Sequence, residues 1–368
     1  MAPYLVIGLL ALGITFVATP AVRWTSLRIG AVDVPNDRKV HACPTPTLGG
    51  GAIFVGILGA GTGAFFLNDL RSVFTQSSEW LGIIVGGAVI FALGTIDDLR
   101  DLPAPVKLSG QIFAAGICFL AGVQMQYILI PGGVLVLDPN LSAVVTVVWL
   151  VAMMNAINLV DGLDGLAAGI VAIASAAFFV YSFQLGTQVY SPAPTAPLVA
   201  IVLVGSTLGF LRHNFHPARI FMGDSGAMLL GLVLGAATVS GVGKPAYALP
   251  PGSIFLAYFP LVIPVLVIAI PLLDALLAIV RRARARRNVF HADKAHIHHR
   301  LMDLGHGHRQ AVVVMYVWSA LAAGAGLAFT FLQRADLLFA FPVAVGAIVL
   351  YTLFPVLTKA INGRMGNR

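Results

Sequence analysis

Charged residues are scarce in this chain of 368 amino acids, since Asp, Glu, Lys and Arg together make up only 10% of it. Soluble globular proteins are about 25% charged and about 45–50% apolar, whereas 58% of this chain is hydrophobic. The shortage of charge excludes an ordinary soluble enzyme, a disordered chain and a coiled coil. What remains is an all-α polytopic membrane protein.

Cysteine and low-complexity sequence are also lacking. The two cysteines, Cys43 and Cys118, cannot form a disulfide framework. Glycine (39 residues) and proline (21 residues) stay below a low-complexity composition and follow no triplet period, which excludes collagen. Glutamate is almost absent as well, because Glu79 is the single glutamate among 15 acidic residues.

Apolar runs long enough to cross a bilayer are plentiful. A spanning helix needs about 17–25 apolar residues, and eleven such runs predict eleven transmembrane helices in one integral membrane domain, residues 1–368. The ninth run contains three prolines and is expected to be kinked. The runs cover residues 3–22, 48–67, 80–96, 106–123, 141–158, 162–183, 197–212, 224–242, 252–280, 311–332 and 336–358.

The basic residues predict the orientation. With the N-terminus outside, 19 of the 22 Lys and Arg residues fall in inside loops, and only Arg71, Lys244 and Arg334 fall outside. The C-terminus is then inside, and the first span is not a secretory signal peptide because no basic residue precedes it. We expect a short hairpin on the outer face near 125–138. The cytoplasmic loops 23–47, 97–105, 212–223 and 281–310 are expected to form the active-site face.

Aspartates gather at the predicted inner edge of the spans, in three short motifs. They are Asp97, Asp98 and Asp101 in GTIDDLRDL, Asp161 and Asp164 in NAINLVDGLDGLAAG, and Asp224 in ARIFMGDSGAMLLG. Carboxylates in low-dielectric surroundings are costly and repel one another unless a cation intervenes. A hard divalent cation, Mg²⁺ or Mn²⁺, fits oxygen ligands and phosphate.

Each aspartate also has a structural interpretation. A single Asp at the end of a span is most often a helix cap, but three motifs converging on one face favour a site. Asn155, Asn158 and Asp161 recur every three residues and share a face if their helix continues. The helix that starts near Asp224 could offer its N-terminal amides to an anion. For Asp274, a structural and a functional role stay equally open.

The basic inside loops add candidate ligands. His296, His298 and His299 form an HxHH pattern followed by Arg300, for which hydrogen bonds to a sugar or phosphate are favoured over zinc. His306 and His308 are interpreted as ordinary loop histidines. Lys39 is a candidate contact to phosphate or nucleotide, and Lys107 is a candidate cation beside the aspartates. Phe221 is interpreted either as an interfacial anchor or as a base-stacking platform. The arginine-rich segment Arg281–Arg287 is interpreted as an anchor to lipid head groups.

The ordered motifs carry a resemblance. DVPNDRKVHACPTPTLGG, GTIDDLRDL, NAINLVDGLDGL, NFHPARIFMGDSG and DKAHIHHRL occur in that order between about residues 33 and 301. The set closely resembles the polyprenyl-phosphate N-acetylhexosamine-1-phosphate transferases, glycosyltransferase family 4. Within that family it is most similar to the bacterial branch that uses undecaprenyl phosphate and UDP-N-acetylglucosamine.

The resemblance implies roles for individual residues. Asp224 and Asn158 would ligate Mg²⁺, Asp97 and Asp98 would lie beside the lipid phosphate, and Lys107 would hold the diphosphate. Phe221 and Asp164 would hold the uridine, with Lys39 nearby, and His296, His298 and His299 would line the sugar. We therefore expect catalytic roles for Asp97, Asp98, Lys107, Asp161 and His296, and substrate contacts from Lys39, Asp101, Asn155, Asp164, Phe221, His298, His299 and Arg300.

The resemblance also implies a reaction and a place for it. The expected enzyme of the bacterial cytoplasmic membrane transfers N-acetylglucosamine-1-phosphate to undecaprenyl phosphate and releases UMP. This is the first membrane step of a cell-envelope polysaccharide such as lipopolysaccharide or teichoic acid. A homodimer in membrane lipid is a family-level expectation, and no nucleic acid is expected as a partner. A direct transfer is ranked above a two-step route through a phospho-aspartate.

Three alternatives remain. The sister branch, phospho-N-acetylmuramoyl-pentapeptide transferase, matches HIHHRL less well. A secondary transporter would place its site near the midplane, often with inverted repeats, whereas these aspartates sit at one face. A CDP-alcohol phosphatidyltransferase needs an Arg shortly after the first DG pair, and DGLDGLAAGIVAIASA has none.

Overall fold

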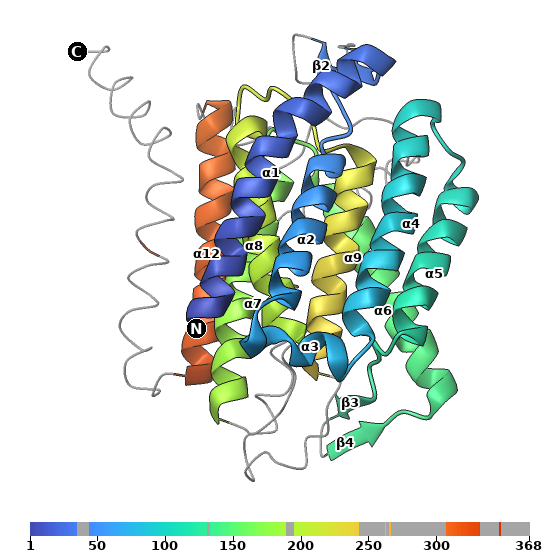
Figure 1. Ribbon diagram of the computed structural model, residues 1–368, viewed down its shortest axis with the longest axis vertical. Helices are drawn as coiled ribbons and strands as arrows, with labels where there is room; N and C mark the ends of the chain where they lie inside the picture. The colour runs from blue at the N-terminus through green and yellow to red at the C-terminus, as the bar shows by residue number, and fades with distance from the viewer. Residues whose placement is uncertain are drawn as a thin grey trace, which may run out of the picture.

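The fold is a bundle of long helices, seen in a computed structural model (Figure 1). The structure describes residues 1–34, 44–130, 133–188, 195–242 and 307–331, with isolated positions at 262, 265 and 346. Its main helices are α1 (Ala2–Ile29), α2 (Gly50–Phe65), α4 (Glu79–Arg100), α5 (Ala104–Leu120), α6 (Pro139–Val160), α7 (Leu166–Gln188), α8 (Thr195–Asn214), α9 (Gly223–Val242) and α12 (His308–Phe331).

The helices agree with a polytopic membrane protein. In the described ranges, seven are long and apolar enough to cross a membrane, and α2 makes an eighth if it is joined to the short helices η1 (Asn68–Leu70) and α3 (Ser72–Thr75) across a bend of 103°. The nine main helices fall on nine of the predicted runs. The runs at 252–280 and 336–358 lie almost entirely outside the described residues, so a total of eleven spans stays a prediction.

Helix α9 forms the centre of the bundle. Of its most apolar stretch, 89% is buried, and it packs against α2, α4, α6 and α8. A helix that is apolar on every side is stable only when neighbours surround it. The outer helices instead expose large apolar side chains, such as Leu9 and Val17 on α1 and Phe113 on α5. Exposed apolar surface of this kind suits contact with lipid.

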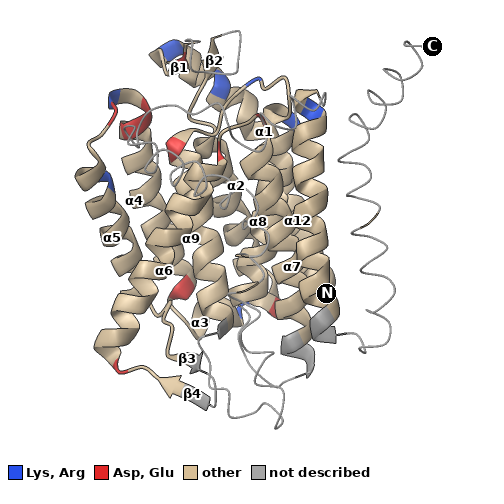
Figure 2. Cartoon of the chain, turned by 180° about the vertical axis from the view of Figure 1, so that it is seen from behind, with Lys and Arg blue, Asp and Glu red and all other residues tan. Residues whose placement is uncertain are grey.

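Two small sheets lie at opposite ends of the bundle (Figure 1). At one end, β1 (Val32–Asp33) pairs antiparallel with β2 (Thr45–Pro46). At the other end, β3 (Tyr127–Ile130) pairs antiparallel with β4 (Gly133–Val136), inside the range expected to form a hairpin. Most of the coloured Lys and Arg residues lie at the β1–β2 end (Figure 2). Which side of a membrane each end faces stays a prediction.

Candidate active site

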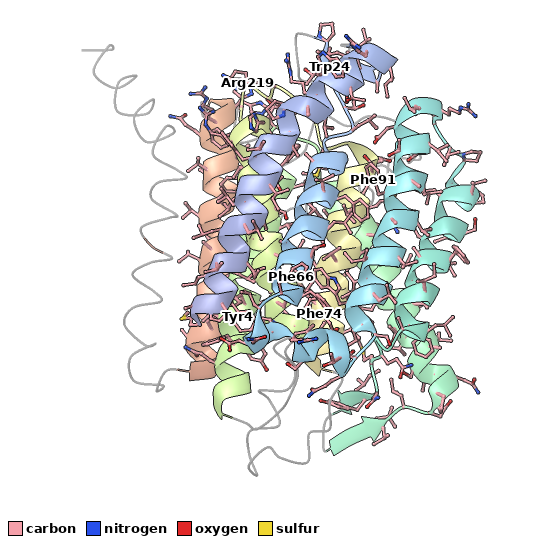
Figure 3. The ribbon with its side chains drawn as sticks, in the orientation of Figure 1. Tyr4, Trp24, Phe66, Phe74, Phe91 and Arg219 are labelled. Atoms are coloured by element: carbon pink, nitrogen blue, oxygen red, sulfur yellow. The ribbon has the colours of Figure 1, made fainter. Side chains whose placement is uncertain are left out.

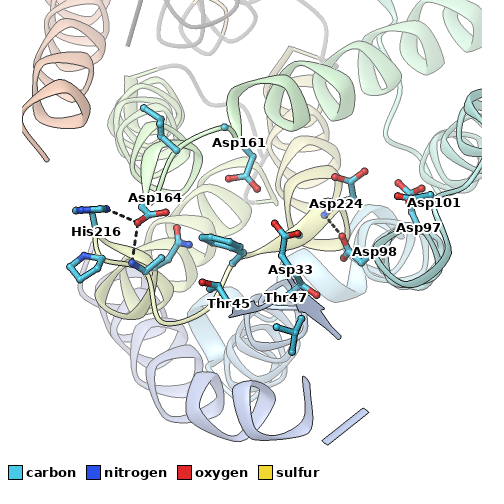
Figure 4. Close-up of a pocket in the computed structure, with 18 of the residues that line it drawn as sticks. Asp33, Thr45, Thr47, Asp97, Asp98, Asp101, Asp161, Asp164, His216 and Asp224 are labelled. Atoms are coloured by element: carbon cyan, nitrogen blue, oxygen red, sulfur yellow. Dashed lines mark hydrogen bonds and ion pairs between the residues drawn. The ribbon is translucent and has the colours of Figure 1, made fainter. Parts of the chain in front are cut away.

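A cavity of about 910 Å³ opens at the β1–β2 end of the bundle. Its wall is formed by the β1–β2 pair, the end of α4, the start of α5, the turn between α6 and α7, the end of α8, the loop that leads into α9, and the start of α12. Among its lining residues are Asp33, Thr45, Thr47, Asp97, Asp98, Asp101, Lys107, Asp161, Asp164, His216, Phe221, Asp224 and His308. Figure 4 shows the labelled aspartates of α4 and α9 on one side, Asp164 with His216 on the other, and Asp33 and Asp161 between them.

The turn between α4 and α5 brings Lys107 to Asp97. Asp101 directly follows α4, takes a left-handed conformation with φ of 49° and donates its N–H to the Asp97 carbonyl. The buried Asp97 carboxylate then accepts the Leu102 N–H at 2.8 Å through Oδ1. Its Oδ2 lies 2.6 Å from the Lys107 ammonium. Both oxygens of Asp97 are therefore engaged, which holds the lysine in the wall of the cavity.

Lys107 also joins α5 to α9. Its ammonium forms a second ion pair with Oδ2 of Asp224, at the start of α9. The other oxygen, Oδ1, accepts a hydrogen bond from the Asn158 amide at 2.9 Å. Three helices thus meet at one carboxylate, and the structure brings together Asn158 and Asp224, the pair expected to hold a metal ion. Carboxylate and amide oxygens are the donors that Mg²⁺ and Mn²⁺ prefer, so this residue set fits such an ion.

Asp98 caps α9. Its Oδ1 accepts the Asp224 N–H at 2.7 Å and its Oδ2 accepts the Ser225 N–H at 3.2 Å. These are the amides that the sequence suggested for a bound anion, and here the anion is the Asp98 carboxylate itself. Gly223, with φ of 71°, sits directly against this carboxylate, where a Cβ atom would collide with it. The contact therefore needs a glycine before Asp224.

Asp161 ends α6, because its φ and ψ of −76° and 57° stop the helix after Val160. The shared helix face expected of Asn155, Asn158 and Asp161 therefore stops one residue short of Asp161. Burial, followed by the negative charges of nearby aspartates including Asp224, raises the pKa of Asp161 to about 8. A cation entering this cavity would reverse that shift.

Asp164 occupies the opposite side of the cavity. Its Oδ2 accepts the Ala218 N–H at 3.0 Å and lies 2.7 Å from Nδ1 of His216. His308 of α12 stacks on the His216 ring, with centroids 4.2 Å apart and planes inclined by 21°. His308 therefore lines the cavity, which corrects its interpretation as an ordinary loop histidine.

Asp164, His216 and His308 bring three possible ligand atoms within 4.8 Å of one another. The two imidazole rings nevertheless lie almost parallel. Because the lone pairs of an imidazole lie in its ring plane, the lone pairs of stacked rings do not converge on one ion. We therefore interpret this group as a polar stack that holds Asp164, not as a metal site.

Helix α12 fixes the loops that carry these groups. Arg309 donates from Nε to the His216 carbonyl at 2.8 Å, and the Tyr316 hydroxyl donates to the Gly165 carbonyl. Asn214, at the end of α8, accepts the Gly165 N–H at 3.1 Å and donates to the Ile220 carbonyl at 2.9 Å. The Asp164 turn and the loop before α9 are thus tied together by side chains from two helices, α8 and α12.

Some expected residues lie elsewhere. Asn155 is not among the residues that line the cavity, and it forms a pair with Gln111 of α5, in which its amide donates at 2.8 Å. The expected contacts Lys39, His296, His298, His299 and Arg300, together with Cys43 and Asp274, lie outside the described residues. Their roles stay predictions.

Sequence reasoning missed several residues of the cavity wall, including Asp33, Thr47, Asn214 and His216. Asp33 and His216 belong to the motifs DVPNDRKVHACPTPTLGG and NFHPARIFMGDSG, so their position within these motifs was the available signal. Nothing local distinguishes them from other loop residues, because their neighbours in the cavity come from distant parts of the chain.

Comparisons with known proteins identify a family and several relatives of this chain. A family model described as Glycosyl transferase family 4 matches residues 80–242, the part of the chain that carries most of the cavity. The chain is 42% identical to decaprenyl-phosphate N-acetylglucosaminephosphotransferase of Mycobacterium tuberculosis, over 96% of this chain and 89% of that protein.

Two further relatives carry related names. The chain is 36% identical to a probable undecaprenyl-phosphate N-acetylglucosaminyl 1-phosphate transferase of Bacillus subtilis, over 82% of this chain and 78% of the relative. It is 29% identical to undecaprenyl-phosphate alpha-N-acetylglucosaminyl 1-phosphate transferase of Yersinia pestis, over 87% and 82%. The resemblance inferred from the motifs is thereby confirmed. This chain belongs to glycosyl transferase family 4, as a homologue of the bacterial polyprenyl-phosphate N-acetylglucosamine phosphotransferases.

Proposed function

We propose that this protein transfers N-acetylglucosamine-1-phosphate from UDP-N-acetylglucosamine to a polyprenyl phosphate and releases UMP. The observation that carries the proposal is the set of contacts at Asp224. Its carboxylate, in the wall of the cavity, pairs with the Lys107 ammonium and accepts a hydrogen bond from the Asn158 amide. A cationic and metal-compatible junction beside apolar helices suits a reaction between two phosphate-bearing substrates, one of them a lipid.

The reaction hardly needs a general base. An oxygen of the lipid phosphate attacks the β-phosphorus of the UDP-sugar, the bond to the α-phosphate oxygen breaks, and UMP leaves with that oxygen. A phosphate monoester has its second pKa near 6, so the acceptor is mostly dianionic at neutral pH. The greater obstacle is the repulsion between the two anionic substrates, which cationic groups in the site must offset.

Lys107 is the described residue best placed for that task. Its ammonium lies between Asp97 and Asp224, where it can turn toward the diphosphate when the donor binds. A bound Mg²⁺ or Mn²⁺, held by Asp224 with Asn158, would add neutralisation of the diphosphate and of the departing UMP. Asp164, on the opposite side of the cavity, is assigned to the uridine.

The contacts of Asp97 and Asp98 support direct transfer over a phospho-aspartate. Both oxygens of Asp97 and both oxygens of Asp98 are already paired. A carboxylate whose oxygens are all engaged must break those contacts before it attacks phosphorus. We assign Asp98 a positioning role, because it holds the start of α9 and thereby the Asp224 carboxylate.

The setting of the enzyme follows from the same arguments. Its basic end would face the cytoplasm, in a bacterial cytoplasmic membrane, and its product would start a cell-envelope polysaccharide. The lipid could be decaprenyl or undecaprenyl phosphate, since named relatives use each.

The test is UMP release by the full chain in detergent with Mg²⁺, UDP-N-acetylglucosamine and either polyprenyl phosphate. Asp224→Asn is the loss-of-function control, and Arg28→Gln, on the exposed end of α1, is the matched neutral control. Lipid-dependent UMP release that is lost only in Asp224→Asn is expected.

Rival donors sharpen the test. UMP release only from UDP-N-acetylmuramoyl-pentapeptide would move the protein to the sister branch. UMP release only from UDP-N-acetylgalactosamine would show that the donor sugar is N-acetylgalactosamine and not N-acetylglucosamine. No UMP from any donor, in protein shown to be folded, would overturn the transferase proposal.

A further inference from the structure

A second cavity lies beside the first, next to the loop that joins α8 to α9. Its volume is about 530 Å³, and three arginines contribute to its wall: Arg212, Arg219 and Arg309. His216 and Pro217 line both cavities, so a single loop separates them. No acidic residue is among the described residues that line this second cavity.

Backbone contacts anchor two of these arginines, Arg309 through its side chain and Arg219 through its main chain. Arg309 donates from Nε to the His216 carbonyl at 2.8 Å, which leaves its terminal nitrogens for another partner. The Arg219 N–H donates to the His213 carbonyl at 2.9 Å, and the Arg219 carbonyl accepts from Nε of Arg23 at 3.0 Å. Figure 3 shows Arg219 at this end of the bundle, near α1 and α12.

No carboxylate compensates these charges in the part of the chain that the structure describes. The ion pairs found there involve Lys107 and His216, and none involves Arg212, Arg219 or Arg309. Three guanidinium groups around one cavity repel one another, so an anion bound among them would be stabilised. Guanidinium groups bind phosphate oxygens well, because their donors match two oxygens at once.

The surface next to the arginines is apolar. Leu208 lies one turn from Arg212 on α8 and is 43% exposed, and Val313 lies one turn from Arg309 on α12 and is 37% exposed. Leu211 and Phe215 add apolar wall to the cavity itself. On both helices the apolar residue lies deeper in the bundle than its arginine. The arrangement matches a molecule with an anionic head and an apolar tail.

We propose that this second cavity binds the phosphate group of an anionic phospholipid at the membrane surface. Basic pockets between membrane helices are a known way to hold anionic head groups. The site is distinct from the aspartate-lined cavity and does not depend on the transferase reaction. A soluble phosphate could satisfy the same arginines, and the experiment below separates the two sources.

The test is native mass spectrometry of the full chain, released from a neutral detergent after titration with phosphatidylglycerol, phosphatidylcholine or inorganic phosphate. One saturable phosphatidylglycerol is expected, in preference to phosphatidylcholine. The double variant Arg212→Gln/Arg219→Gln should weaken it by about 25-fold, because each basic side chain near a membrane surface strengthens binding by about fivefold.

Matched variants decide the outcome. Arg28→Gln removes an arginine from the same end of the bundle, outside both cavities, and should bind as the unaltered chain does. Arg212→Lys/Arg219→Lys keeps the charge and should retain most of the binding even if the double glutamine variant folds poorly. Equal loss in Arg28→Gln, or no loss in the glutamine variant, would overturn the proposal. Inorganic phosphate that displaces the lipid would reassign the site to a soluble anion.

Discussion

At the residue scale, the candidate site is a set of carboxylates whose charges are only partly compensated. Lys107 pairs with Asp97 and Asp224, whereas Asp161 has no cation beside it among the described residues. Carboxylates held together in low-dielectric surroundings retain their protons unless a cation enters. The site is therefore expected to respond to pH and to divalent cations together.

Asp161 gives the pH prediction. Its pKa of about 8 in the folded chain exceeds the value of about 3.9 for an unfolded chain. The folded chain therefore binds the proton more tightly, and the free energy of unfolding falls as the pH rises toward 8. In a chelator, the unfolding temperature should decrease between pH 6 and 8, and Asp161→Asn should flatten that decrease.

Mg²⁺ should remove the same decrease in the unaltered chain. The measurement is thermal unfolding in detergent across this pH range, with chelator and with Mg²⁺. An identical pH profile for the unaltered chain and Asp161→Asn would contradict the assignment of the raised pKa.

Variants of Asp98 distinguish its hydrogen bonds from its charge. Asn keeps one acceptor oxygen, so Asp98→Asn should lose the hydrogen bond to one of the two amides of α9, and Asp98→Ala should lose both. Since a hydrogen bond contributes about 1 kcal/mol, Asp98→Asn should unfold at a lower temperature than the unaltered chain, and Asp98→Ala at a lower temperature still. If Asp98 positions α9, UMP release should follow the same order. Equal loss of activity in the two variants, despite unequal stability, would favour a direct chemical role for its charge.

At the scale of elements, the start of α9 is where the site is assembled. The backbone of α9 packs directly against the backbones of α4 and α2, because both of those helices have a glycine at the contact. A Cβ atom on Gly94 of α4 would lie 2.9 Å from the Asp224 carbonyl carbon. A Cβ on Gly50 of α2 would lie 2.8 Å from the Ser225 carbonyl carbon. This close approach lets Asp98 reach the first amides of α9.

Gly94→Ala should push α4 away from α9. Overpacking of a close helix contact costs about 1–3 kcal/mol, and the displacement would also pull Asp98 from its amides. We expect a lower unfolding temperature and a loss of UMP release. Gly116→Ala on α5 is the matched control, since no atom lies within 4 Å of its added Cβ. Helix propensity alone predicts that this control gains about 1 kcal/mol. Equal behaviour of the two variants would show that the α4–α9 contact is not tight.

At the scale of the whole molecule, charge is distributed unevenly between the two ends of the bundle (Figure 2). The β1–β2 end carries the aspartate-lined cavity and the arginine-lined one, and the β3–β4 end carries neither. The positive-inside rule predicts that the β1–β2 end faces the cytoplasm. Both the nucleotide sugar and the anionic head groups of the inner leaflet would then be within reach.

Thiol labelling tests this orientation. In a Cys43→Ser background, the buried Cys118 is the remaining native cysteine. A membrane-impermeant thiol reagent applied to intact cells should label Arg71→Cys, on the turn after α2, and should not label Arg28→Cys, at the end of α1. Permeabilised cells provide the positive control for Arg28→Cys. Labelling of Arg28→Cys alone in intact cells would reverse the topology.

The sequence by itself determined the class of the protein and the composition of its site. Runs of apolar residues, the scarcity of charge and the three aspartate motifs are local patterns, and they predicted nine of the helices now described, and aspartates that share one cavity. The ordered motifs also indicate the family, because a reaction requires particular residue types at its site, and these are visible in the sequence.

The tertiary structure alone decided how those residues pair. The Asp98 cap, the bridge from Lys107 to Asp224 and the stack of His216 on His308 join positions between about 90 and 130 residues apart in the chain. Asn155 and Asn158 are the same residue type and belong to the same three-residue repeat, yet the Asn155 side chain pairs with Gln111. Such contacts depend on how helices approach one another, which periodicity does not encode, and they determine which carboxylates remain open to a cation.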